Sequence, residues 1–148
     1  EERAFERFKG GCIVCTTTEA ESNNERFVLE NDHAMVICPF WSSSPYELLI
    51  MPKDHQQHLT DSSDAALTGV GLAVRDALKH LVATLGDIAF NLVFHTAPSH
   101  HEGTYHWHAH LFPKLTTTAG FERGTGVMIN IIAPEFAADA LRSAAVNA

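Results

Sequence analysis

The chain of 148 residues has no long apolar run. Its apolar stretches are short, as in Ala34–Cys38, whereas a helix that crosses a membrane needs about 20 consecutive apolar residues. The sequence also lacks the basic segment followed by an apolar one that is typical of a secretion signal. We therefore expect no membrane partner and a cytoplasmic protein.

Basic residues are scarce as well. Lys and Arg together number 10 against 18 Asp and Glu, which gives a net charge of −8 when histidine is neutral. A domain this acidic binds nucleic acids and anionic membrane surfaces poorly, so we expect no nucleic-acid partner. Any phosphate group of a ligand must then be bound by a few local donors rather than by a basic surface.

Cysteine is the third scarce residue, with only three in the chain. An odd and small number does not suit a disulfide framework, and a reducing compartment is the simpler inference. Histidine, by contrast, is as common as Lys and Arg together, with 10 residues, several of which are clustered. This histidine bias is the most informative feature of the composition.

The overall composition, 45% hydrophobic and 19% charged, is typical of a globular protein. The length suits one domain over residues 1–148. The sequence begins with Glu1 rather than Met, and the charged segment Glu1–Lys9 reads as a short helix. We therefore expect the chain to be a segment of a longer protein or a shortened form of one.

The apolar pattern predicts an α+β fold, in which an antiparallel sheet of about five to six strands packs against one long helix. Asn31-Asp32 indicates a tight hairpin, and the polar segment Thr16–Asn24 is expected to be a loop. We expect strands at Arg26–Glu30, His33–Cys38, Tyr46–Met51, Ala89–His95, Tyr105–Phe112 and Val127–Ile132.

The long helix is expected to begin at Thr60 or Asp61 and to end near Leu85. Its apolar residues recur every three to four positions, which is the spacing of a helix with one buried face. Gly86 follows and would close the helix in a conformation that glycine adopts easily. A last helix is expected at Glu135–Arg142, after a proline that suits the first helical turn.

Three histidines alternate with other residues near the end of the predicted sheet. In a strand, His106, His108 and His110 share one face, while Trp107 and Ala109 point to the opposite face. Imidazoles are a poor filling for a core, because each needs a hydrogen-bond partner or a metal. The pattern favours a functional site over a solvated face of the strand.

A second motif is Cys12-x2-Cys15, whose thiolates can bind one metal ion from a tight turn. A redox couple is the alternative. His55 follows the strand predicted at Tyr46–Met51 and strengthens the metal interpretation. Two cysteines and two histidines make a closed tetrahedral zinc site of the structural type.

Taken together, these motifs resemble those of the histidine-triad superfamily. Residues 106–112 follow its pattern of His-φ-His-φ-His-φ-φ, where φ is apolar, and the Cys-x2-Cys motif and Pro52-Lys53-Asp54-His55 occur in the same order as in that superfamily. Residues from about Cys12 to Arg142 also look like the C-terminal half of galactose-1-phosphate uridylyltransferases, most clearly in NLVFHTAP and YHWHAHLFPKLTTTAGFERGTGVMIN.

The resemblance implies a set of roles for these residues. His108 matches the nucleophile that forms a nucleotidyl-histidine intermediate, and His110 would lie beside the phosphate. UDP-glucose would be the donor and galactose 1-phosphate the acceptor, and a homodimer is expected. The implied zinc ligands are Cys12, Cys15, His55 and His106.

The chain also departs from this family. The uridylyltransferases carry their nucleophile in a His-Pro-His-Gly-Gln motif of the first half, which is absent here. Their second half supplies a structural metal, in some members iron, on residues that match His95, His108 and His110 together with a Glu of the first half. The intact set of cysteines and histidines favours zinc over iron. A stand-alone nucleotide hydrolase and a non-catalytic half are the rival interpretations.

Chemistry supports the role of His108 independently of the resemblance. A neutral imidazole is a competent nucleophile for phosphorus near pH 7, provided that its other nitrogen donates a hydrogen bond, for which a backbone carbonyl is the expected acceptor. Charge on the phosphate would be stabilised by His110, Lys114 and backbone N–H groups. We also expect His95 to lie beside the triad strand, because a single loop joins the two predicted strands.

Three further segments have less specific patterns. The loop Pro98–Gly103 could bind phosphate through Ser99 and its two histidines, but a solvated loop is the preferred interpretation. Phe40 and Trp41 could flank a base or could pack in a core or a dimer. Gly120–Gly126 is rich in glycine but lacks the strand-then-helix context of a nucleotide-binding loop.

Overall fold

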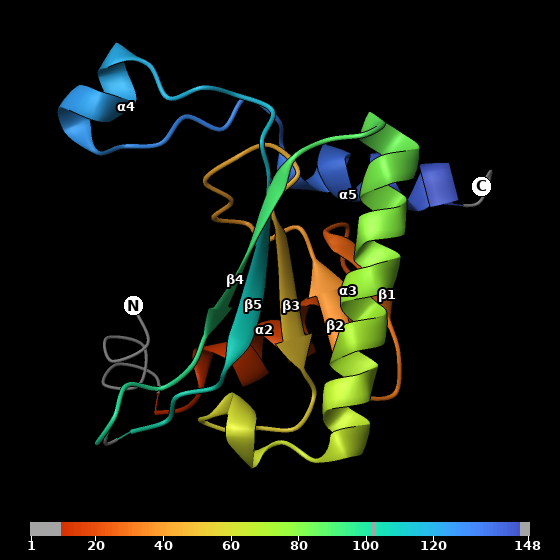
Figure 1. Ribbon diagram of the computed structural model, residues 1–148, viewed down its shortest axis with the longest axis vertical. Helices are drawn as coiled ribbons and strands as arrows, with labels where there is room; N and C mark the ends of the chain where they lie inside the picture. The colour runs from red at the N-terminus through yellow and green to blue at the C-terminus, as the bar shows by residue number, and fades with distance from the viewer. Residues whose placement is uncertain (1–9, 102, 146–148) are drawn as a thin grey trace.

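A five-stranded antiparallel sheet organises the molecule, and its strands lie in the order β1-β2-β3-β5-β4 (Figure 1). The computed structural model describes residues 10–101 and 103–145. The predicted α+β class is confirmed, and the helix expected at Glu1–Lys9 lies outside the described residues. The strands are β1 (Phe27–Glu30), β2 (Ala34–Ile37), β3 (Leu48–Pro52), β4 (Phe90–His95) and β5 (His108–Pro113).

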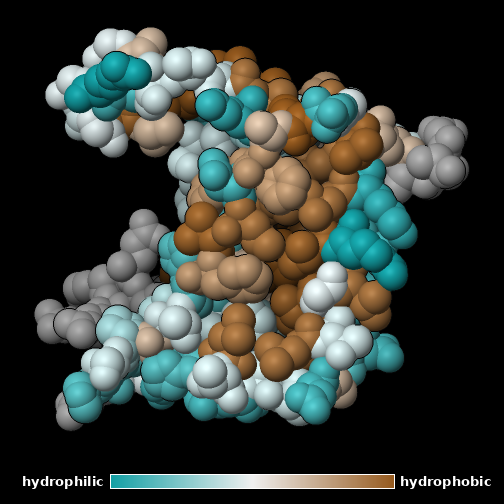
Figure 2. Space-filling view, in the orientation of Figure 1, coloured by the Kyte–Doolittle hydropathy of each residue, from teal (hydrophilic) through white to brown (hydrophobic). Residues whose placement is uncertain are grey.

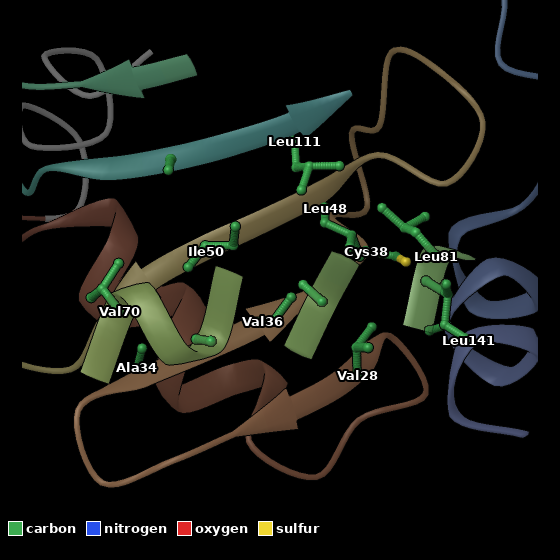
Figure 3. Close-up of a cluster of buried hydrophobic side chains, with 14 of the residues drawn as sticks. Val28, Ala34, Val36, Cys38, Leu48, Ile50, Val70, Leu81, Leu111 and Leu141 are labelled. Carbon is green, nitrogen blue, oxygen red and sulfur yellow. The ribbon is translucent and has the colours of Figure 1, made fainter. Parts of the chain in front are cut away.

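Two helices, α3 (Asp64–Leu85) and α5 (Pro134–Ala145), cover one face of the sheet (Figure 1). The main core fills the space between them and the sheet (Figure 3). Alternate strand residues reach it, so β5 contributes Ala109 and Leu111 from the face that the sequence pattern assigned to the core. Trp107 is also fully buried, and its Nε1–H donates to the Ser62 hydroxyl at 2.9 Å.

The opposite face of the sheet carries α2 (Ile13–Glu21) over a smaller apolar cluster that includes Val14, Met35 and Leu49. The prediction of a loop at Thr16–Asn24 is therefore wrong for its first part, because the residues up to Glu21 are helical. The hydroxyls of two helix threonines donate back to carbonyls one turn earlier, so these polar side chains are satisfied within the helix. Burial of its apolar side decides the conformation of this segment.

The long helix begins later than predicted. Thr60 and Asp61 lie in a short 3₁₀ turn, η1 (Leu59–Asp61), and Ser63 is the N-cap of α3, where its hydroxyl accepts from the backbone N–H of Ala66 at 3.2 Å. Gly86 ends the helix with a positive φ of 79°, as expected. Among the described residues, no helix is long and apolar enough to cross a membrane.

The sixth strand predicted at Val127–Ile132 is wrong. This segment pairs with no strand in the described part of the chain, and Ile131 is 71% exposed. It follows α4 (Gly120–Thr125) in an arm that extends away from the sheet (Figure 1). The glycine-rich segment is thus a short helix that ends at Gly126, whose φ of 72° is the left-handed conformation of a helix cap.

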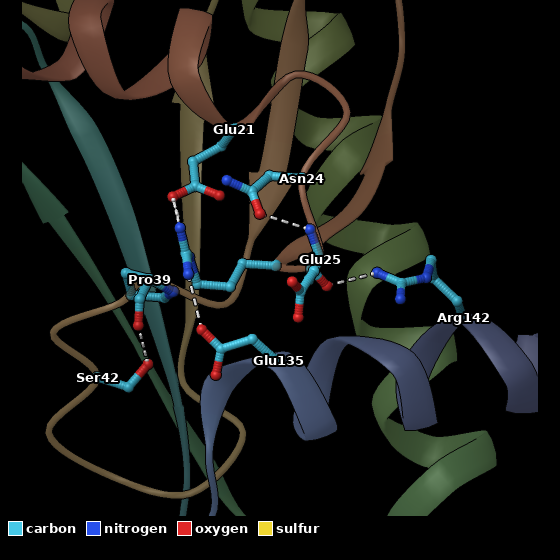
Figure 4. A network of polar contacts seen from close by, with 8 residues as sticks. Glu21, Asn24, Glu25, Pro39, Ser42, Glu135 and Arg142 are labelled. Atoms are coloured by element: carbon cyan, nitrogen blue, oxygen red, sulfur yellow. Dashed lines mark hydrogen bonds and ion pairs between the residues drawn. The ribbon is translucent and has the colours of Figure 1, made fainter.

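Arg26, directly before β1, links helices on the two faces of the sheet through Glu21 and Glu135, which Figure 4 labels. Arg26 donates to Glu21 at the end of α2, from Nη2 at 2.7 Å and from Nε at 3.0 Å. Its Nη1 donates to Glu135 at the start of α5 at 2.7 Å. Since Glu21 is buried, these contacts compensate a carboxylate that would otherwise be costly to desolvate.

Candidate functional site

Two of the triad histidines, His108 and His110, lie on the face of β5 that is opposite to the main core. His106 comes just before the strand. On the neighbouring strand β4, His95 pairs with His108, and its ring centroid lies 5.1 Å from both the His108 and the His110 rings. The prediction that His95 lies beside the triad strand is confirmed. We call His95, His108 and His110 the three-histidine group.

His108 has the environment of a neutral imidazole. Its Nδ1 is 2.9 Å from the backbone carbonyl of His106, which accepts a hydrogen bond, so Nε2 is the nitrogen without a proton. Burial lowers the pKa of His108 to about 4, against the opposing effect of this hydrogen bond, and the nearby His110 and His95 lower it further. The ring therefore stays uncharged at neutral pH with one lone pair available.

A buried carboxylate that the sequence patterns did not single out lies behind His110. Glu47 is 3% exposed, and its Oε1 lies 2.9 Å from Nδ1 of His110. Burial would raise the pKa of Glu47, but hydrogen bonds from His110 and from the Ser43 N–H and hydroxyl outweigh this effect and lower the pKa below its usual value. An acidic residue at the start of an otherwise apolar strand was the available signal for it.

The three-histidine group opens into a pocket of about 780 Å³, a volume typical of small-molecule sites. One wall is α2, which contributes Val14 and Thr17, and Trp41 lines the rim. Phe112 lies parallel to the His110 ring with centroids 5.4 Å apart. Apolar and aromatic walls around a few imidazoles suit a ligand with a flat apolar part and a polar or anionic part.

Four residues from three separate segments form a second group, which we call the Cys–His group: Cys12, Cys15, His55 and His106. The Cys15 Sγ lies 3.3 Å from Nδ1 of His55 and 3.4 Å from Nδ1 of His106. Sulfur and nitrogen ligands of one tetrahedral zinc lie about 3.5 Å apart, as follows from the usual bond lengths. The ligand atoms of all four lie within 4.8 Å of one another, so this group could hold a metal ion.

The chemistry of these four residues also fits a cation. Burial and the neighbouring Cys12 raise the pKa of Cys15 to about 11, so the thiol keeps its proton unless a positive charge compensates the thiolate. Burial lowers the pKa of His106 to about 4, so its imidazole is neutral, and its Nδ1 is the nitrogen that faces the Cys15 sulfur at 3.4 Å. A neutral imidazole and an otherwise costly thiolate are the forms that a metal ion stabilises.

The remaining predicted residues differ in their positions. Trp41 and His101 line the pocket, whereas Phe40 does not and instead packs under the Arg26 guanidinium, 5.6 Å from its ring centroid. Lys114 is exposed and is not part of the pocket lining. The expected contribution of a lysine to phosphate binding therefore has no support from the described pocket.

Comparison with known proteins identifies related domains. The family described as "Galactose-1-phosphate uridyl transferase, C-terminal domain" matches residues 8–142. ADP-glucose phosphorylase of Arabidopsis thaliana is 31% identical over 93% of this chain and 39% of that protein. Galactose-1-phosphate uridylyltransferase of Haemophilus influenzae is 32% identical over 64% of the chain and 28% of that protein.

Solved structures give the same result. The crystal structure of the Arabidopsis thaliana phosphorylase with bound ADP-glucose has a TM-score of 0.87 and 30% identity, over 95% of this chain and 46% of the other. A zinc-bound histidine-triad protein of Mycobacterium smegmatis shares the fold, with a TM-score of 0.67 and 16% identity over 92% and 94% of the two chains. The chain spans less than half the length of the phosphorylase and uridylyltransferase relatives that it matches.

Proposed function

The chain belongs to the galactose-1-phosphate uridyl transferase family, whose C-terminal domain it matches, and from this membership we propose that it transfers a nucleoside monophosphate through an adduct on His108. Its relatives are nucleotidyl-transfer and nucleotide-sugar phosphorylase enzymes. The proposed donor is a nucleotide sugar, with UDP-glucose and ADP-glucose as the two compounds to test. The proposed acceptor is a sugar phosphate such as galactose 1-phosphate.

The observation that carries this proposal is the hydrogen bond from His108 Nδ1 to the His106 carbonyl at 2.9 Å. It assigns the lone pair to Nε2 of a ring that lines the pocket. Neighbouring groups hold the ring in place, since His95 and His110 flank it at centroid distances of 5.1 Å and 5.3 Å. A fixed, neutral imidazole at a pocket wall is the form that attacks an electrophilic phosphorus.

The reaction would run in two displacements. The His108 Nε2 lone pair forms a bond to the α-phosphorus of the nucleotide sugar, and the bond from that phosphorus to the bridging oxygen breaks, which releases a sugar phosphate with its electron pair. A phosphate oxygen of the acceptor then attacks the same phosphorus, and the electron pair of the N–P bond returns to Nε2. His110 would lie beside the transferred phosphate, and a covalent intermediate of this kind gives ping-pong kinetics.

We further propose that the Cys–His group binds one zinc ion with a structural role. When bound, zinc would supply a fixed link between the start of α2, the segment after β3 and the segment that leads into β5. Four protein ligands complete the tetrahedral coordination, so none is left for a substrate. A reducing, cytoplasmic compartment would keep both cysteines available as ligands.

The test is transfer of a labelled α-phosphate from UDP-glucose, and in parallel from ADP-glucose, to the zinc-loaded protein. The reaction is quenched at alkaline pH, since histidine–phosphorus bonds are labile in acid. Label is expected on the wild type and on His100→Asn, an exposed loop residue outside the pocket, and is expected to be absent from His108→Asn. No label with either donor, in protein that is folded and zinc-loaded, would contradict the proposed activity.

A second candidate function is a non-catalytic, metal-binding half of a uridylyltransferase. One observation favours it, because the ligand nitrogens of the three-histidine group all lie within 4.8 Å of one another and could hold a metal ion, zinc or iron. A metal on His108 Nε2 would occupy the proposed nucleophile. Two bound metal ions per chain, of which His95→Gln removes one, would support this alternative.

A stand-alone nucleotide hydrolase is the other alternative. In that case water, rather than a sugar phosphate, would be the acceptor of the nucleoside monophosphate.

We also propose that the functional form is a homodimer. The edge strand β4 supports this proposal, because nearly every residue in it is exposed and Phe90, Val93 and Phe94 are each at least 40% exposed. Figure 2, in the orientation of Figure 1, shows brown, apolar surface in the middle of the face on which β4 and α3 lie. Sedimentation should give twice the mass of the chain, and Val93→Lys on this edge should shift the protein to the monomer.

A further inference from the structure

A carboxylate behind the three-histidine group has no role in the transfer chemistry above. Glu47 precedes β3, and both of its oxygens are engaged. Its Oε2 lies 2.6 Å from the backbone nitrogen of Ser43 and 2.9 Å from the Ser43 hydroxyl, and its Oε1 lies 2.9 Å from Nδ1 of His110. The side chain therefore joins the loop before β3 to the pocket histidine on β5.

We propose that Glu47 is a positioning residue that keeps a proton on Nδ1 of His110, so that Nε2 is the nitrogen that meets the ligand. The argument is a count of donors and acceptors. A backbone N–H can only donate, so Oε2 must accept from Ser43. An ionised carboxylate has no proton of its own, so at Oε1 the hydrogen must come from His110 Nδ1.

The local backbone is built to bring this carboxylate inward. Tyr46, directly before Glu47, has a φ of 58°, in the left-handed region that residues with a side chain rarely adopt. The N–H of Glu47 donates to the Ser44 carbonyl at 3.3 Å, which closes a turn directly after Ser43, the residue that donates to the carboxylate. An unfavourable conformation retained at a turn of this kind indicates that the position of the next side chain matters.

The consequence concerns what His110 can do. With Nδ1 occupied, its Nε2 lone pair can bind a metal ion or accept a proton, and once protonated it can donate to a phosphate oxygen with Glu47 as counter-charge. This role rests on the proposed function, because it requires a ligand in the pocket. The tautomer itself can be measured without substrate, so its failure and the failure of the transfer reaction are distinguishable.

The experiment is an NMR measurement of proton–nitrogen couplings in the imidazole rings of zinc-loaded, ¹⁵N-labelled protein. His110 is assigned by the loss of its signals in His110→Gln. In the wild type, Nδ1 of His110 should carry a proton. In Glu47→Gln, the amide oxygen must still face the Ser43 N–H, so the amide NH₂ faces His110 Nδ1, which should then lose its proton to Nε2.

Ser43→Ala is the matched control. It removes the hydroxyl contact but keeps both the carboxylate and the backbone donor, so the His110 tautomer should not change. An Nδ1 of His110 without a proton in the wild type would overturn the proposal. This measurement does not depend on whether any variant folds. An unchanged tautomer in folded Glu47→Gln would overturn it as well.

Discussion

Two groups of histidines each take residues from β5 or from the segment just before it, yet their surroundings differ. The Cys–His group brings together two sulfurs and two imidazoles, and none of its members lines the pocket. The three-histidine group consists of imidazoles alone, all of which line the pocket. The first group has the ligands for complete metal coordination, whereas the second leaves nitrogen atoms accessible to a ligand. The same residue type therefore suits a structural role in one place and a reactive role in the other.

The difference arises from what lies over each end of β5. Residues two apart in a strand are separated by about 6.6 Å, so neighbouring triad histidines face different neighbours. At His106 the start of α2 supplies the cysteines, and at His108 and His110 the same helix stands back and forms a pocket wall. The predictions below separate the two groups experimentally.

The largest effect is expected from Cys15→Ser. Loss of one ligand should release the metal and lower the free energy of unfolding by about 3 kcal/mol or more, because metal binding is partly folding free energy. Zinc content and urea unfolding are the measurements. Cys38→Ala, in the main core and outside both groups, should retain zinc. Zinc that stays bound to Cys15→Ser would show that the Cys–His group is not the site.

A smaller loss is expected from Arg26→Met, which leaves the buried carboxylate of Glu21 without its ion-pair partner. The free energy of unfolding should fall by about 2 kcal/mol, because Arg26 is partly exposed and water replaces some of the lost contact, and zinc should dissociate more readily because α2 carries the cysteines. Arg75→Met is the control, since its ion pair with Asp76 is exposed and should contribute little. Equal effects of the two substitutions would contradict the role of Arg26 as the anchor of α2.

Acid should weaken the fold through the same histidines. Because the pKa of His108 is lowered to about 4, the unfolded chain binds protons below pH 6.5 that the folded chain does not, so stability falls as the pH drops. The loss is at most about 1.4 kcal/mol per pH unit for this imidazole. Urea midpoints at pH 6.5 and pH 5 should therefore differ more in the zinc-loaded wild type than in His108→Asn. An equal change of the urea midpoint in the two proteins would contradict the low pKa of His108.

The smallest effect is expected at the rim of the pocket. Trp41→Ala should weaken nucleotide binding about tenfold, which corresponds to the lower range for an aromatic ring stacked on a base. Its neighbour provides the control, because Phe40 lies outside the pocket lining and Phe40→Ala should leave affinity unchanged. Calorimetric titration with the two nucleotide sugars measures both. A loss of affinity with Phe40→Ala alone would mean that the base binds elsewhere.

Local patterns predicted much of this arrangement. The alternation around His108 assigned the histidines and the core residues to opposite faces, and the short connection between two strands placed His95 beside them. Both inferences depend only on the period of a strand and on one loop, so the sequence contains the necessary information.

Features that depend on distant partners were not predictable in this way. Glu47 meets His110, 63 positions further along the chain, and nothing in the apolar strand that follows Glu47 indicates that contact. The threonine-rich segment of α2 looks like a loop until its apolar side meets the sheet. The segment at Val127–Ile132 has the apolar residues of a strand but no neighbouring strand to pair with in the described residues.

The position of α2 has a thermodynamic consequence. Its first turn carries the cysteines of one group, and Val14 and Thr17 form a wall of the pocket beside the other. Metal binding at the Cys–His group and nucleotide binding in the pocket would therefore both act on the same helix. If a bound metal favours the arrangement of α2 that forms the pocket, linkage requires that a bound nucleotide raise metal affinity by the same factor. Zinc release by a chelator should then slow as nucleotide is added.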